Sequence, residues 1–245
     1  MSGVVKDREA QIAEMLDSTD LGVIAEMVRL AEQLPGPREH PPDSVVVLIY
    51  EVAQKAELLE DSSICLGLFR RVLAHPVENL QFKPGAWFRI GIVLQRSGDF
   101  GAAIDAFRNA LAYKECWFEL AGLIRYRLAS LLAETEEYDE AAALLEEVQK
   151  QYLPNPHIEL HMVTVLLART LLMAGKPEAA LVALAPLADA PAAEWTARVQ
   201  SLRAEIFESV GRMPDAREAY QKIVENPHAR QELRTAAAYR LSALR

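Results

Sequence analysis

Apolar residues recur every three or four positions along almost the whole chain, and this spacing predicts amphipathic helices. Short turns with glycine or proline, such as 97–99 and 175–177, interrupt the pattern. A glycine can end one helix in the left-handed conformation, and a proline can begin the next. No stretch of convincing length alternates with period two, so we expect no sheet. The predicted helices span residues 5–17, 21–34, 44–58, 61–74, 84–97, 100–113, 117–134, 138–151, 156–174, 176–189, 192–210, 213–225 and 229–244.

A small residue recurs at a nearly constant interval in the second helix of successive helix pairs. Cys65, Ala103, Ala141, Ala180 and Ala216 are separated by 38, 38, 39 and 36 residues. A small side chain lets paired helices approach closely, and a bulky residue one turn later lies on the same buried stripe. A period of this size predicts an all-α solenoid of about 13 helices, stacked as antiparallel hairpins.

The Pro-rich stretch 34–43 predicts a boundary along the chain. Before it, residues 1–43 form a predicted N-terminal helical hairpin and connector, which is a candidate cap for the stack. After it, residues 44–245 form the predicted solenoid, which ends in a capping helix.

The stretch from Trp87 to Ala110 resembles the tetratricopeptide repeat family, with Gly91, Ala103 and Phe107 at matching places. The family period is 34 residues, whereas the spacing here is 36 to 39. We place the extra residues in longer first helices, such as 117–134 and 156–174. The resemblance covers roughly residues 44–245. It implies a right-handed superhelix whose first helices line a concave groove.

The resemblance also implies which residues face that groove. Tyr50, Phe88 and Tyr126 hold equivalent places in three successive repeats, and helix 156–174 is apolar on almost every face. Aromatic and methionine side chains give a large, adaptable contact area for a peptide or helix, and arginines bind carboxylates in a bidentate fork. The predicted partner-binding groove consists of Tyr50, Phe88, Ile92, Tyr126, Met162, Val165, Leu172, Arg89, Arg96, Arg127, Arg169 and Arg198.

The same residues are compatible with other arrangements. The superhelix can close on itself, or its own N-terminal helices or a second copy can fill the groove. The arginines can instead pair with Glu205, Glu208 or the acidic residues between 134 and 147. Family members that clamp a C-terminal carboxylate use lysine and asparagine at fixed groove positions. This chain lacks both residue types there, so we do not expect that role.

Charge and composition narrow the class of partner. The chain has 245 residues and a net charge of −9, so we do not expect nucleic acid as a partner. Residues 1–16 lack the apolar core of a signal peptide, and the longest apolar run, 162–174, is shorter than the roughly 20 residues that cross a bilayer. With only two cysteines, these features favour a cytoplasmic protein without membrane insertion.

Signals of catalysis are weak. His157 and His161 can share a helix face, but no third ligand follows at a suitable spacing, so we predict no metal. Cys65 is one of the regularly spaced small residues that pack between helices, and the sequence pairs no base with Cys116. We therefore predict no catalytic residue and no cofactor. The expected function is a non-enzymatic adaptor or scaffold that binds a peptide or helical segment of another protein. The alternatives are a ligand- or peptide-sensing regulatory module and a self-assembling structural scaffold, for which a homo-oligomer is expected.

Overall fold

The computed structural model describes residues 3–36, 43–76, 82–113, 116–151, 158–188 and 193–244. These residues form 13 α-helices and two short 3-10 helices and contain no β-strand, so the predicted all-α fold is confirmed. The helices are α1 (Gly3–Met15), α2 (Leu21–Glu32), α3 (Asp43–Ala56), η2 (Glu57–Leu59), α4 (Ser62–Ala74), α5 (Phe82–Arg96), α6 (Phe100–Leu111), α7 (Phe118–Glu134), α8 (Tyr138–Gln151), α9 (Leu160–Met173), α10 (Pro177–Leu184), η3 (Ala185–Leu187), α11 (Glu194–Ser209), α12 (Met213–Glu225) and α13 (Gln231–Ala243).

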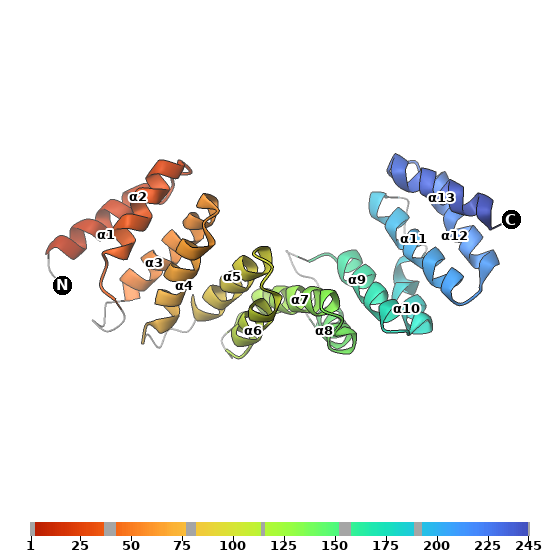
Figure 1. The fold of residues 1–245 in the computed structure, drawn as a ribbon, viewed down its shortest axis with the longest axis horizontal. Coiled ribbons are helices and arrows are strands. Elements are labelled where there is room, and N and C mark those ends of the chain that lie inside the picture. The colour runs from red at the N-terminus through yellow and green to blue at the C-terminus, as the bar shows by residue number, and fades with distance from the viewer. Residues whose placement is uncertain are drawn as a thin grey trace. The chain divides into compact units, whose positions relative to one another are not determined.

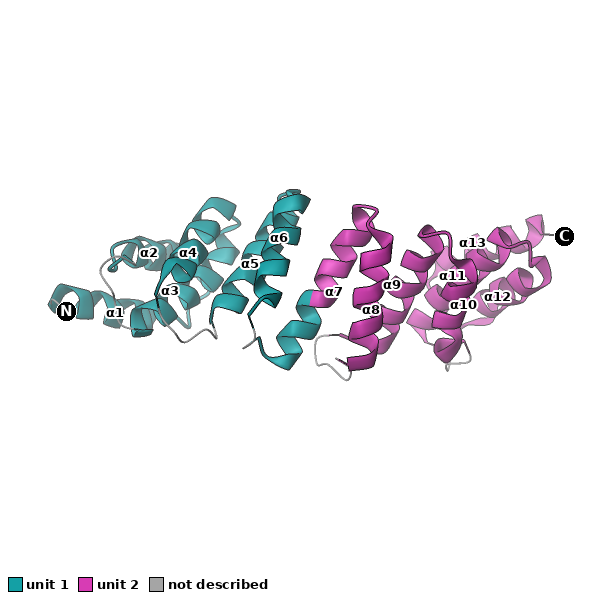
Figure 2. Cartoon of the chain, turned by 90° about the horizontal axis from the view of Figure 1, so that it is seen from below, with its two compact units in different colours: residues 1–124 teal, residues 125–245 magenta. Residues whose placement is uncertain are grey.

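The chain divides into two compact units, residues 1–124 and 125–245, with the boundary inside α7 (Figure 2). Within each unit, consecutive helices pack side by side as hairpins (Figure 1). One apolar cluster in the first unit extends from Ile12 on α1 to Ala106 on α6. The N-terminal hairpin thus shares its core with the helices that follow it. The separate segment 1–43 and its role as a cap stay predictions.

The hairpin turns have the conformation that the glycines predict. Gly98, Gly175 and Gly211 have φ values of +80°, +72° and +76°. In the turn between α7 and α8, Glu136 adopts the same left-handed conformation, with a φ of +67°. In each of these four turns, a backbone N–H just after the left-handed residue donates to a carbonyl five residues earlier. The four bonds run from Asp99 to Leu94, Glu137 to Leu132, Lys176 to Leu171, and Arg212 to Phe207. This pattern satisfies helix-end carbonyls that would otherwise lack a donor.

The small residues that recur in the second helices are buried, as predicted. Ala103, Ala141, Ala180 and Ala216 are fully buried, and Cys65 is almost so. The facing helix also needs a small residue, because a Cβ atom added to Gly91 would lie 2.5 Å from the ring of Phe107. The close approach of α5 and α6 therefore depends on a glycine opposite an aromatic ring.

Two helices differ from their predicted bounds by more than two residues. The structure has α9 begin at Leu160 rather than at 156, and residues 156 and 157 lie outside the described part of the chain. The helix predicted over 176–189 is α-helical only to Leu184 and then tightens to the 3-10 helix η3. Pro186 lies in η3 and has no N–H to continue the α-helical hydrogen bonding, which accounts for the change.

Polar contacts connect the last three helices of the second unit. The hydroxyl of Tyr220 on α12 donates to Glu208 on α11 at 2.8 Å, and Arg240 on α13 forms an ion pair with Glu208 at 3.4 Å. Buried Asn226, after α12, donates to the carbonyl of Ala193 and to the hydroxyl of Thr196. These contacts fix α12 and α13 beside α11.

Candidate functional site

The candidate site is a cavity of about 630 Å³ in the second unit. It is lined by residues of α7, α9, α11 and the start of α13, and five of the predicted groove residues meet there. Those five are Tyr126, Met162, Val165, Arg169 and Arg198. The other lining residues are His161, Leu166, Trp195, Ser201, Leu202, Glu205, Arg230, Glu232 and Leu233.

The helical repeat explains why these side chains meet. On α9 the lining residues after His161 fall at positions 162, 165, 166 and 169, and on α11 those after Trp195 fall at 198, 201, 202 and 205. Steps of three and four residues put side chains on one face of a helix. The two lists are related by a shift of 36 residues, which is the last interval of the repeat. Equivalent faces of α9 and α11 therefore line the same cavity.

A stacked pair of rings forms part of the wall. The imidazole of His161 lies on the indole of Trp195, with ring centroids 4.9 Å apart and an angle of 16° between the planes. His161 Nδ1 is 3.0 Å from a carboxylate oxygen of Glu159, which orients the imidazole. Sequence reasoning missed Trp195, although it lies one turn before the groove position Arg198. Extending the groove-facing frame by one turn would have found it.

The rest of the wall is largely apolar. Met162 is 39% exposed, Val165 and Leu166 are half-buried, and Leu202 is buried. Tyr126 is half-buried, and this burial raises the pKa of its phenol, while the nearby charge of Arg127 acts in the opposite direction. The wall thus combines aliphatic side chains with the rings of the aromatic residues.

Charged groups of both signs surround this apolar surface. Arg169 and Arg198 are exposed, and neither forms an ion pair with any residue that the structure describes. The proposed pairing of these two arginines with Glu205 or Glu208 is not observed. By contrast, Arg230 pairs with Glu194 at 2.6 Å.

The predicted groove residues of the first unit lie in more enclosed surroundings. Tyr50 packs against the rings of Phe69 and Phe82, with centroids 5.9 and 5.4 Å apart. Phe88 is only 9% exposed, and its ring lies 6.0 Å from that of Phe107. This burial leaves little of the Phe88 ring for a partner.

The remaining predicted residues have varied positions. Arg89 pairs with Glu57 at 3.3 Å, a partner that the sequence did not suggest. Ile92 is half-buried and Arg96 is exposed. In the second unit, Leu172 is half-buried and Arg127 is exposed, and neither is among the described residues that line the cavity. A partner-binding role for these residues stays a prediction.

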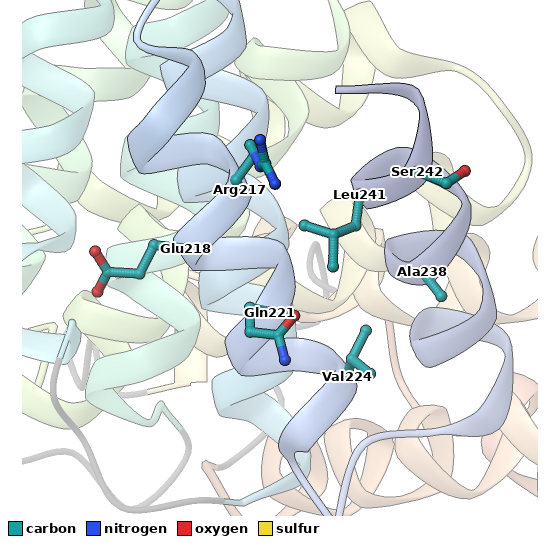
Figure 3. A pocket seen from close by; sticks show the side chains of 7 residues that line it. All are labelled: Arg217, Glu218, Gln221, Val224, Ala238, Leu241 and Ser242. Carbon is teal, nitrogen blue, oxygen red and sulfur yellow. The ribbon is translucent and has the colours of Figure 1, made fainter. Parts of the chain in front are cut away.

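A second cavity of about 410 Å³ lies between α12 and α13. Figure 3 shows Leu241 and Val224 pointing into the space between the two helices, while Glu218 points away from it. None of the predicted groove residues lines this cavity. We therefore take the first cavity as the candidate site.

The described residues give little support for a metal site or a reactive thiol. His157 lies outside the described residues, and the described part of the chain contains no group of three His, Cys, Asp or Glu residues placed to bind a metal ion. Burial raises the pKa of the Cys65 thiol, which disfavours the reactive thiolate. No helix in the described ranges is long and apolar enough to cross a membrane.

Comparisons with known proteins agree with the repeat pattern. A family model described as tetratricopeptide repeat matches residues 88–156, and one described as tetratricopeptide repeat-like domain matches residues 159–245. A search of curated protein sequences found no significant match.

Among solved structures, YrrB, described as a TPR protein with an unusual peptide-binding site, has a TM-score of 0.65 at 14% identity; the match covers 91% of this chain and 100% of that one. MamA from Desulfovibrio magneticus RS-1 has a TM-score of 0.60 at 18% identity, over 74% of this chain and 93% of its own. PilF of Pseudomonas aeruginosa has a TM-score of 0.56 at 16% identity, over 82% and 87%. At these identities the similarity shows the fold alone.

Proposed function

Because the chain belongs to the tetratricopeptide repeat family, we propose that it is a non-enzymatic adaptor or scaffold that binds a peptide or helical segment of another protein. The proposed binding surface is the cavity of the second unit, between α9 and α11. We place the protein in the cytoplasm, in keeping with its content of only two cysteines.

The observation that carries this proposal is the meeting of five predicted groove residues in one cavity. The groove prediction used only sequence positions and the family resemblance, and it selected residues on three helices that line the same space. The cavity volume of about 630 Å³ is within the range typical of small-molecule and cofactor sites, so the space can take a few side chains of a peptide. Its exposed methionine, half-buried tryptophan and flanking arginines are residue types enriched in protein interfaces.

A solved structure of similar fold also supports peptide binding. YrrB is described as having a peptide-binding site, and its fold matches most of this chain. The identity of 14% is too low to transfer individual binding residues. The choice of cavity therefore depends on the residues of this chain.

The test is selection of 12-residue peptides from a random library with the full chain as bait. Val165→Asp puts a charge into the cavity wall and should abolish binding of the selected peptides. Val182→Asp is the matched control, because Val182 is 74% exposed on α10 and does not line the cavity. If both variants bind the selected peptides as the unmodified chain does, the cavity is not the binding surface.

A further inference from the structure

Two arginines of the cavity stand out because their charge is not neutralised. Arg169 on α9 and Arg198 on α11 both line the cavity, and both are exposed. Neither has an ion-pair partner within the described ranges. A guanidinium presents a planar fork of donors that matches a carboxylate, and such charge-assisted bonds are stronger than neutral ones.

The other charged residues of the same cavity have interactions of their own. Glu205 accepts a hydrogen bond from the hydroxyl of Ser201 at 3.3 Å. Glu232 lies in the first turn of α13, where the helix dipole favours a negative charge. The third arginine, Arg230, is paired with Glu194. Arg169 and Arg198 are therefore the two arginines lining the cavity that no described carboxylate neutralises.

The apolar part of the wall defines a second requirement for the ligand. Met162, Val165 and Leu166 on α9 lie on the same cavity as the stacked rings of His161 and Trp195. A bulky apolar side chain placed there would remove these partly exposed groups from water, which favours binding. The cavity thus offers an apolar contact area close to two arginines.

We infer that the segment bound in this cavity is acidic, with a bulky apolar side chain followed or preceded by Asp or Glu side chains that bind Arg169 and Arg198. This inference rests on the proposed function. The carboxylates come from side chains within the segment rather than from its C-terminus, because residues of four helices line the cavity and a chain that crosses it can contact each in turn.

The experiment uses the peptides selected by the full chain, synthesised with acetylated N-termini and amidated C-termini. They should be enriched in Asp or Glu beside an aromatic or aliphatic residue. Replacing those acidic residues by Gln should weaken binding, measured by fluorescence anisotropy, by about tenfold or more. The double substitution R169Q and R198Q should remove this preference for Glu over Gln. Arg217→Gln, at an exposed arginine of α12 outside the cavity, should keep it.

The outcomes separate the inference from the proposed function. If the selected peptides are neutral or basic and Val165→Asp abolishes their binding, the bound segment is not acidic. The proposed function would then still stand. Acidic peptides that bind only with a free C-terminal carboxylate would overturn the assignment to side chains. Failure to select any peptide, or selection of peptides insensitive to Val165→Asp, would overturn both.

Discussion

The imidazole of His161 on α9 stacks on the indole of Trp195 at the start of α11, with ring centroids 4.9 Å apart. The contact joins the first helices of two successive repeats at the wall of the candidate cavity. A carboxylate oxygen of Glu159 lies 3.0 Å from Nδ1 of this imidazole. The indole is therefore held in place before a partner arrives, which reduces the conformational entropy lost on binding.

We predict that Trp195→Ala weakens binding of a selected peptide by about 2 kcal/mol or more, because large aromatic residues at the centre of an interface carry much of its free energy. Trp117→Ala is the control, since Trp117 is 53% exposed and lies outside the cavity. Isothermal titration calorimetry measures both variants. Equal affinities of the two variants for the peptide would show that Trp195 is not part of the binding surface.

Packing of the repeat is tested on α8. Ala141 is fully buried and Ala143, two residues later, is exposed. Ala141→Leu should destabilise the fold by about 1–3 kcal/mol through overpacking, and the equivalent Ala103→Leu should act in the same way. Ala143→Leu should change stability little. Urea denaturation followed by circular dichroism gives the three free energies of unfolding. If the substitutions at 103 and 141 leave the free energy of unfolding unchanged, the repeat register is wrong.

Two glycines form a matched pair in the first unit. A Cβ atom at Gly91 would lie 2.5 Å from the Phe107 ring, whereas nothing lies within 4 Å of the corresponding position at Gly67. Gly91→Ala should therefore lower the melting temperature. Gly67→Ala should raise it slightly, since alanine is favoured over glycine inside a helix by about 0.5–1 kcal/mol. A melting temperature unchanged by Gly91→Ala would contradict the close packing of α5 on α6.

The pH dependence of stability should reveal the contact between Tyr220 and Glu208. Burial, and then the hydrogen bond to the Glu208 carboxylate, raise the pKa of the Tyr220 phenol to about 12. The folded state therefore holds this proton more tightly than the unfolded chain, in which the pKa is about 10. The stabilisation is complete below pH 10 and is lost as the pH rises toward 12.

Chemical denaturation between pH 9 and pH 12 measures this effect. The difference in free energy of unfolding between the unmodified chain and Tyr220→Phe should shrink over that interval. Other groups titrate equally in both proteins, so the difference isolates the phenol. A difference that stays constant to pH 12 would show that Tyr220 is not held in its protonated form.

Much of the fold could be predicted because it depends on local sequence features. The spacing from Cys65 to Ala216 fixed the hairpin register, and turn glycines such as Gly98 fixed where helices end. The turn at Glu136 adopts the same left-handed conformation without a glycine. The shortening of α10 at Pro186 also had a local cause, but the helical periodicity around it concealed the change.

The site was harder to predict because exposure depends on contacts between helices. Tyr126 and Phe88 hold equivalent repeat positions, yet Tyr126 lines a cavity and Phe88 is buried against Phe107. Glu232 and Leu233 of α13 lie after the last repeat that the frame covered, so their place at the cavity had no sequence signal. The stacking of His161 on Trp195 is a contact between two helices. The apolar periodicity within a single helix cannot predict such a contact.

The most direct test of the central claim is site-specific photo-crosslinking to a selected peptide. The photoreactive residue p-benzoylphenylalanine replaces Val165 in the cavity wall or Val182 on the exposed face of α10, each in the full chain. Cavity binding predicts a peptide crosslink, identified by mass spectrometry, from position 165 and none from position 182. Crosslinking from position 182 with none from position 165 would contradict it.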